Sequence, residues 1–351
     1  MAHVAQAGES VILEIDGHEV AISHLDRVYW PAETALGQAA VTKRDFVCYL
    51  IAAARHMLPH LIDRPLTLFR WPTGVEGRRV LMKHWEIDLP PFVARTDIFS
   101  DAKGHTDEYA MCNNLATLVW LAHMGALEIH AWHSRVRPGP DTPVTSTDFA
   151  QSTKALQASI IEYPDYILFD LDPFIYAGTE ARRGQPDLNA PAFTLVRAIA
   201  RSLKRVLDAM SLASLVKTSG KTGLHVVVPI RRTVPYHVAR ELARVIGMHL
   251  MRAHPEAITL EWNVQKRAGK VFIDANMNVR GKSMTTPYSP RGLPGAPVSM
   301  PIAWRDLDRV YPLDFRLPNV FPRLATLRDP WSDLDARKQP IEERIAALGS
   351  G

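Results

Sequence analysis

The chain has 351 residues, of which 47% are hydrophobic and 22% charged, a composition that predicts a globular protein with a substantial core and excludes a disordered or fibrous one. The 41 Lys and Arg residues against 37 Asp and Glu residues give a net charge of +4, which permits a polyanionic partner without requiring one. Neither Cys48 nor Cys112 has the spacing of a disulfide framework or a metal site, and no segment resembles a signal peptide or a membrane span. We therefore expect a cytoplasmic protein with no membrane partner.

The first part of the chain predicts short strands and two helices. Val11–Ala21 alternates apolar and polar residues around an Asp-Gly pair, which predicts a hairpin, and Pro65–Phe69 has the apolar pattern of a short strand. Apolar residues at helical spacing predict a helix over Lys43–Met57, with Thr42 as its N-cap. The same spacing predicts the most apolar helix of the sequence over Leu115–Leu127.

The second part mixes strands with helices. A stretch rich in Pro, Gly, Ser and Thr, Arg137–Ser152, predicts a surface connection after the N-terminal lobe. Prolines between Pro287 and Pro322 predict an extended wrapping segment, and the tail after Asp329 again has a helical pattern. The predicted strands are Tyr166–Phe169, Leu215–Lys217, Leu224–Ile230 and Val271–Asp274, and the predicted helices are Ala192–Met210 and Tyr236–Ala253.

These elements predict an α/β or α+β class. We expect one unit over residues 1–351, with an N-terminal lobe at 1–150, a second lobe at 160–300 and a C-terminal wrapping segment at 301–351.

The strongest chemical signal is the segment Tyr166–Pro173, in which an apolar strand ends in two carboxylates. Residues i and i+2 of a strand point to the same face, so Asp170 and Asp172 lie side by side with about 7 Å between their Cα atoms. Two such acids repel each other, and Mg²⁺ or Mn²⁺ is the usual partner that neutralises them. The alternative is a strand end whose acids cap a loop.

A second signal is the turn Lys217–His225, which contains two glycines, two lysines and a histidine. Its backbone N–H groups could face phosphate oxygens, because glycine lets the main chain approach closely. The tripeptide Gly220–Thr222 imitates the end of a Walker loop, but the leading glycine of that motif is missing and a strand follows, so we reject it. An ordinary polar hairpin remains the alternative.

A third signal is a cationic stretch with a single acid, Asp274, which follows a strand much as Asp170 does. The acid is either a salt-bridge anchor or a third metal ligand whose neighbours receive phosphate charge. Three carboxylates, a glycine turn and a cationic stretch together suit two-metal phosphoryl transfer. The cations of the stretch are Lys266, Arg267, Lys270, Arg280, Lys282 and Arg291.

In this order along the chain, these segments resemble the bacterial primase-polymerases, which are the polymerase domains of ligase D and their stand-alone relatives in the archaeo-eukaryotic primase superfamily. The resemblance runs from about residue 20 to about residue 330 and implies a two-lobed fold with an RRM-like catalytic sheet flanked by helices. The matching segments are Phe169–Pro173, Lys217–Pro229, Val271–Asp274, Pro287–Arg291 and Pro297–Ser299.

The resemblance also implies residue roles. Asp170, Asp172 and Asp274 would bind two divalent ions, Mn²⁺ or Mg²⁺, with manganese favoured. His130, within the matching segment Glu128–Trp132, would be the active-site histidine, and His133 would be incidental. The positions that match those holding the nucleotide triphosphate are Ser219, Gly223, His225, Arg267 and Arg291. Lys221 stands one place before the family's turn lysine, whose position Thr222 fills.

Near the N-terminus, Ser23–Arg27 and Val41–Lys43 resemble the segment with which the family binds a DNA 5′-phosphate through two lysines. Lys43 matches one lysine and Arg27 replaces the other, which keeps the charge. His24 replaces a usual asparagine. Two further segments matter for DNA: Val80–Lys83 replaces a stretch that is often aromatic, and Arg95–Glu108 is the candidate segment for holding two DNA ends.

The resemblance implies a template-dependent primase-polymerase that extends a 3′-hydroxyl at gaps or breaks in DNA repair, with NTPs preferred over dNTPs. The expected partners are gapped or broken DNA with a 5′-phosphate and NTP or dNTP, and the expected location is the nucleoid in the cytoplasm. No Lys-x-Asp-Gly ligase motif or nuclease extension is seen, so we expect a free-standing polymerase that works with a separate ligase.

Two other functions deserve comparison. A phosphatase of the haloacid dehalogenase type also has Asp-x-Asp at a strand end, but that motif continues with Gly and Thr, whereas Pro173 and Phe174 follow here. A non-catalytic nucleic-acid-binding module could share the fold, but it would have no need for three carboxylates.

Overall fold

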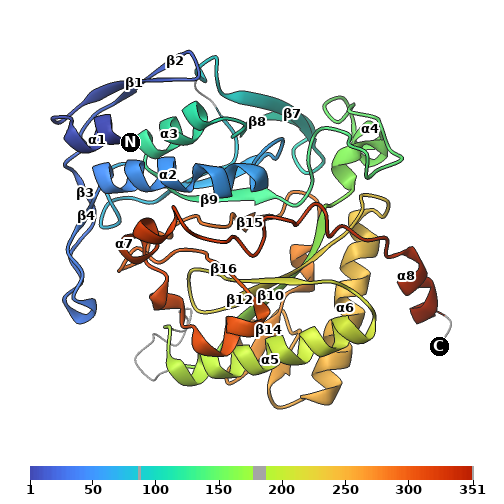
Figure 1. Ribbon diagram of the computed structural model, residues 1–351. Helices are drawn as coiled ribbons and strands as arrows, with labels where there is room; N and C mark the ends of the chain where they lie inside the picture. Colours follow the sequence, from blue (N-terminus) through green and yellow to red (C-terminus); the bar gives the residue numbers. More distant parts are fainter. Residues whose placement is uncertain (86–87, 177–186, 350–351) are drawn as a thin grey trace.

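The computed structural model describes residues 1–85, 88–176 and 187–349, which form two lobes, one above the other in Figure 1. The upper lobe holds the N-terminal elements, and the lower lobe holds the sheet that carries Asp170 and Asp172. The C-terminal segment runs across both lobes. The mixture of helices and antiparallel sheets agrees with the predicted α+β class.

The upper lobe contains a sheet with the strand order β15-β9-β5-β6. The first of these strands, β15 (Ser283–Thr285), comes from far along the chain and pairs with β9 (Ala126–Trp132). The other two are β5 (Leu66–Arg70) and β6 (Val80–Met82). Two helices, α2 (Lys43–Met57) and α3 (Leu115–His123), pack on one face of this sheet through a common apolar core.

The N-terminal predictions are largely confirmed. The expected hairpin is β1 (Val11–Ile15) with β2 (His18–Ile22), and Thr42 caps α2 through a capping box with Asp45. The predicted helix over Leu115–Leu127 is wrong at its end. Gly125 has φ +74°, and a Cβ there would meet the carbonyl oxygen of Trp71 at 2.9 Å, so the chain turns and residues 126–132 form a strand.

The lower lobe contains a sheet with the strand order β13-β14-β10-β12-β11-β16, in which β13 and β14 are parallel and the other neighbours are antiparallel. Two long helices, α5 (Ala190–Ala209) and α6 (Tyr236–Ala253), cover one face of it (Figure 1). The strands are β10 (Tyr166–Pro173), β11 (Leu215–Thr218), β12 (Leu224–Pro229), β13 (Ile258–Thr259), β14 (Val271–Ile273) and β16 (Pro301–Ile302). The strand predicted over Tyr166–Phe169 thus continues through both carboxylates.

Shorter elements complete the fold. They are α1 (Ala2–Gln6), β3 (Val28–Trp30), β4 (Val41–Thr42), β7 (Ala94–Ser100), β8 (His105–Met111), α4 (Thr153–Ala158), α7 (Leu317–Val320) and α8 (Glu342–Gly349). The helical tail expected directly after Asp329 is wrong over residues 329–341, where Trp331 inserts between the lobes and donates its indole N–H to Val216. The helix begins only at Glu342.

A buried ion network joins the lobes behind the lower sheet. Asp165, just before β10, is fully buried, and the cations around it come from both lobes and from the C-terminal segment. These partners are Arg64 at 2.7 Å, Arg135 at 2.9 Å, Lys338 at 2.5 Å and Arg232 at 3.7 Å. Although burial raises the pKa of Asp165, the attraction of these cations outweighs it and keeps the pKa well below its usual value. The network therefore anchors the end of β10 that lies opposite its carboxylates.

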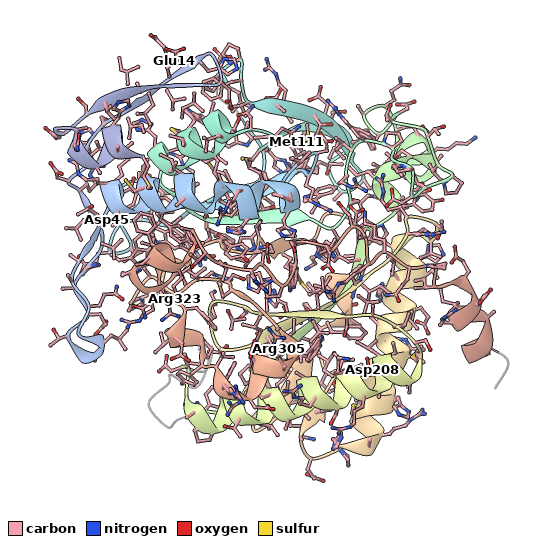
Figure 2. All side chains as sticks on the ribbon, in the orientation of Figure 1. Glu14, Asp45, Met111, Asp208, Arg305 and Arg323 are labelled. Carbon is pink, nitrogen blue, oxygen red and sulfur yellow. The ribbon has the colours of Figure 1, made fainter. Side chains whose placement is uncertain are left out.

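Side chains fill the space between the lobes, whereas Glu14 and Asp208 lie on the outside (Figure 2). Within the described ranges, no helix is long and apolar enough to cross a membrane.

Candidate active site

Strand alternation puts the functional side chains of the lower sheet on one face. Ile167, Phe169 and Leu171 of β10 pack into the core beneath α5 and α6. Asp170 and Asp172 must therefore face the other way, toward the upper lobe. The same alternation applies to β12 and β11, where His225 lies opposite both Asp170 and Lys217 in the strand register.

The three predicted carboxylates meet at this face. The backbone N–H of Asp274 donates to the carbonyl oxygen of Asp170 at 3.2 Å, so β14 carries the third acid directly beside the first. Burial raises the pKa of Asp172, and the charges of Asp170 and Asp274 raise it further. Burial likewise raises the pKa of Asp170 and Asp274, the latter helped by Asp170. A site that crowds negative charge in this way attracts cations.

One oxygen of Asp170 has no hydrogen-bond partner. Oδ1 is buried, and although His225 Nε2 lies 3.2 Å away, the contact is not aligned as a hydrogen bond. Burial, with Lys217 and Arg291 nearby, lowers the pKa of His225 well below its usual value, so the imidazole is neutral and does not compensate the acid. An unpartnered buried carboxylate oxygen is what a hard cation would satisfy.

These side chains therefore fit a divalent metal ion. They offer oxygen ligands, a buried Asp170 oxygen without a partner, and carboxylates that repel one another. The three carboxylates are not drawn together as a ready-made cage, because no group of three or more acidic, histidine or cysteine side chains in the described part of the chain is arranged to hold an ion. Side chains at this face would have to turn toward an ion that they share.

The glycine turn approaches the carboxylates closely. A Cβ at Gly223 would lie 2.2 Å from the carbonyl oxygen of Leu171 and 3.1 Å from Asp172 Oδ1, so only glycine fits. Ser219 Oγ accepts from the backbone N–H groups of Lys221 and Gly223, both at 3.2 Å, which shapes the turn. The polar-hairpin interpretation alone does not explain this contact with Asp172.

Arg291 joins the turn to the upper lobe. Its guanidinium donates to the carbonyl oxygen of Ser219 at 2.9 Å and to Thr285 Oγ1 at 2.6 Å, and it lies 3.2 Å from Glu128 Oε2. Its Nε is buried without a partner. Although burial raises the pKa of Glu128, Arg291 and His130 outweigh it and keep that pKa far below its usual value. Arg291 thus places positive charge between the two sheets.

His130 faces the same space from β9. Its Nε2 lies 3.3 Å from Glu128 Oε2 and 3.3 Å from Thr285 Oγ1, and its ring packs edge-on against Phe69. Burial lowers its pKa to about 4, so the ring is neutral at pH 7. His133 lies apart from these residues, with its ring packed on Tyr166.

The cationic stretch around Asp274 does not gather there as a whole. Arg267 lies over the ring of Phe272 at 3.5 Å and donates to backbone carbonyls. Its charge and that of Lys282 offset only part of the rise that burial and Asp170 cause in the pKa of Asp274. Arg280 instead pairs with Asp101 and Glu162, and Lys270 donates to Pro255. The amino-acid sequence alone could not show that these cations bind different partners.

Several residues at this site received no individual role from the sequence, although Lys217 lies in the predicted turn and Glu128 in the segment that contains His130. Lys217 is fully buried, donates to Ser299 Oγ at 2.5 Å and has its pKa lowered well below its usual value by burial. Every second side chain of a strand points to the same face. This spacing could have indicated Lys217, two residues before Ser219, and Glu128, two residues before His130. Thr285 and Ser299 reach the site only through tertiary packing.

The residues predicted to bind a 5′-phosphate form a separate cationic cluster in the upper lobe. Lys43 is buried, and burial together with the charge of Arg27 lowers its pKa to about 8. Arg27 donates to the carbonyl oxygen of Pro72 at 2.9 Å, and exposed His24 has φ +55° and lies 3.0 Å from Ser23 Oγ. Like charges held together in this way fit an anion.

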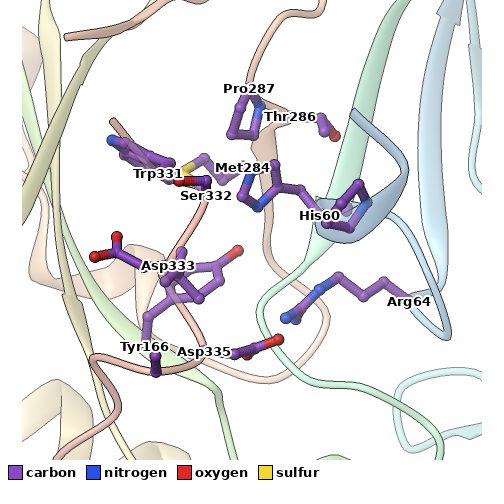
Figure 3. A pocket seen from close by; sticks show the side chains of 14 residues that line it. His60, Arg64, Tyr166, Met284, Thr286, Pro287, Trp331, Ser332, Asp333 and Asp335 are labelled. Atoms are coloured by element: carbon purple, nitrogen blue, oxygen red, sulfur yellow. The ribbon is translucent and has the colours of Figure 1, made fainter. Parts of the chain in front are cut away.

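Figure 3 shows a different cavity, of about 290 Å³, beside His60, Tyr166 and the segment 331–336. Its charged groups already have partners, since Arg64 pairs with Asp165 and Asp335 with Lys338. None of the three carboxylates lines it in the described structure. It contributes no chemistry to the candidate active site.

Comparison with known proteins identifies the family of the chain. The family model described as LigD, primase-polymerase domain, matches residues 42–331. The multifunctional non-homologous end joining protein LigD of Mycolicibacterium smegmatis is 28% identical over 94% of this chain and 38% of that protein. The bifunctional non-homologous end joining protein LigD of Bacillus subtilis is 26% identical over 88% of this chain and 43% of that protein. The chain spans less than half the length of these relatives.

A solved structure supports the fold. The polymerase domain from Mycobacterium tuberculosis ligase D in complex with DNA matches with a TM-score of 0.73 and 27% identity, covering 91% of this chain and 99% of that one. The match confirms the expected α+β fold and favours the polymerase interpretation over the phosphatase.

Replacing Gly223 with alanine tests the geometry of the site. We expect Gly223→Ala to lower the free energy of unfolding by about 1–3 kcal/mol, because the new Cβ overlaps the Leu171 carbonyl. Urea unfolding measures this, with Gly8→Ala as the control, since a Cβ at Gly8 meets nothing within 4 Å. Equal effects of the two variants would show that the turn does not approach β10 as described.

Proposed function

We propose an activity for this chain, which belongs to the LigD primase-polymerase family of nucleotidyltransferase polymerases. The chain extends a 3′-hydroxyl on gapped or broken DNA with NTPs or dNTPs in end-joining repair. The observation that carries the proposal is the group of crowded, half-buried carboxylates beside a glycine turn and Arg291. The names of the relatives and the DNA in the solved neighbour support the pathway and the substrate.

Asp170, Asp172 and Asp274 would hold two divalent ions. When bound, such ions lower the pKa of an attacking hydroxyl and neutralise a triphosphate. We propose that the site prefers Mn²⁺ to Mg²⁺. The chain's own residues do the rest of the positioning. Ser219 and the backbone of the turn up to Gly223 would bind phosphate oxygens, with Arg291, Arg267 and Lys221 adding positive charge.

The two neutral histidines, His225 and His130, would position the substrate through hydrogen bonds. His225 lies against Asp170, and His130 is held by Glu128 and Thr285 on the opposite sheet. Both are neutral at pH 7 and add no charge. His225 has one N–H that it can donate to a substrate oxygen, whereas the N–H of His130 donates to ionised Glu128, so His130 offers its Nδ1 as an acceptor for a substrate hydroxyl. We propose that they orient the nucleotide between the lobes, and that NTPs are used in preference to dNTPs.

Removing a carboxylate should stop catalysis without unfolding the protein. We expect Asp170→Ala and Asp274→Ala each to lower primer extension in Mn²⁺ at least about a hundredfold, while DNA binding stays within about threefold. The pKa of each acid is raised in the folded state, so its charge destabilises the fold at neutral pH. The melting temperature should therefore stay level or rise.

The matched control is Asp208→Ala, an exposed acid on α5 that pairs with Lys204. This variant should extend primers like the wild type. Robust extension by a double variant lacking Asp170 and Asp274 would refute the assignment.

The cationic cluster in the upper lobe should recognise the 5′-phosphate at a gap. We expect Arg27→Ala combined with Lys43→Ala to weaken binding about tenfold or more to gaps with a 5′-phosphate and to leave gaps with a 5′-hydroxyl nearly unchanged. Fluorescence anisotropy with the two DNAs measures this selectivity. Equal losses on both DNAs would contradict the proposed role.

Lys43→Arg supplies a control that depends on pH. The pKa of Lys43 is lowered to about 8, so the wild type should lose selectivity as the pH rises through 8 and the ammonium deprotonates. Arginine stays protonated, so Lys43→Arg should keep its selectivity at pH 9.

A further inference from the structure

One residue of the cationic cluster has no assigned role. His123, the last residue of α3, is half-buried and reaches Lys43, with 3.2 Å between its Nδ1 and the Lys43 Nζ. The backbone N–H of Ser23 also points at this Nδ1, at 3.4 Å. Both contacts come from segments that carry the proposed 5′-phosphate ligands.

These contacts determine the tautomer of the His123 imidazole. An N–H group donates to Nδ1, so Nδ1 carries no proton, and the proton of the neutral imidazole must lie on Nε2. No hydrogen bond or ion pair of Nε2 is found among the residues that the structure describes. The ring therefore has a free N–H donor next to the buried ammonium of Lys43.

The charged groups that act on His123 have one sign. Burial lowers the pKa of His123 most, and Lys43 of α2, His24 of the connection after β2 and Arg70 of β5 lower it further. Arg27 likewise adds to the effect of burial on the pKa of Lys43. The acids on these elements are occupied elsewhere, since Asp26 pairs with Arg44 and Asp45 caps α2. An anion placed here would relieve the repulsion among all of these side chains.

We infer that His123 is a further residue of the 5′-phosphate pocket, where the contacts of Ser23 and Lys43 at Nδ1 keep the ring in the tautomer whose Nε2–H donates to a phosphate oxygen. The inference rests on the proposed function of the cluster. It gives the pocket a neutral, directional donor beside the charges of Arg27 and Lys43, and so sharpens the distinction between a 5′-phosphate and a 5′-hydroxyl.

The test compares two variants on gapped duplexes that end in a 5′-phosphate or a 5′-hydroxyl. His123→Phe keeps a ring but removes both nitrogens, and the ratio of the two dissociation constants should fall about tenfold. His123→Gln keeps one donor and one acceptor at similar separation, and the ratio should stay within about threefold of the wild type. A purely structural role would move binding to both DNAs together.

The control is His249→Phe, which changes an exposed histidine on α6 in the other lobe and should leave the ratio unchanged. Melting temperatures and extension on the 5′-hydroxyl gap report whether the variants are folded. If the wild type discriminates between the DNAs and His123→Phe discriminates equally well, the role of His123 is refuted while the pocket stands. If the wild type does not discriminate at all, both the pocket and the role of His123 fail.

Discussion

The crowding of three half-buried carboxylates is the constraint on which the rest of the structure depends. Asp170, Asp172 and Asp274 share one face of the lower sheet, where burial raises the pKa of all three and repulsion from neighbouring carboxylates raises the pKa of Asp172 and Asp274 further. Such an arrangement weakens the fold at neutral pH and persists only where the surrounding structure holds it in place. The core beneath α5 and α6 and the ion network around Asp165 hold β10 from its other face and its other end.

The candidate site draws its residues from both lobes. The lower sheet supplies the carboxylates, His225 and the glycine turn, whereas the upper sheet supplies His130, Glu128 and Thr285. Arg291 contacts both, through Ser219 and through Glu128, in a segment where Tyr288 has φ +68° and is held by hydrogen bonds from Tyr49 and to Ser299. The position of β15 in the upper sheet therefore also decides where the charge of Arg291 lies.

The features that depend on neighbouring residues in the chain could be predicted from the sequence. Period-two alternation placed Asp170 and Asp172 on one face, and the pattern after Thr42 placed α2 and its cap correctly. The end of α3 was missed because Gly125 turns the chain against Trp71, a contact made only in the folded state. Tertiary packing also decides that Arg280 leaves the site, that Thr285 enters it and that His123 meets Lys43. Such pairs are far apart in the chain and have no local pattern.

The central claim is that cations are shared by the three carboxylates, and anomalous diffraction from crystals soaked in Mn²⁺ tests it most directly. The account predicts manganese peaks within ligand distance of Asp170, Asp172 and Asp274, with the side chains turned toward them. Manganese bound elsewhere, or these carboxylates left without an ion at saturating Mn²⁺, would contradict it.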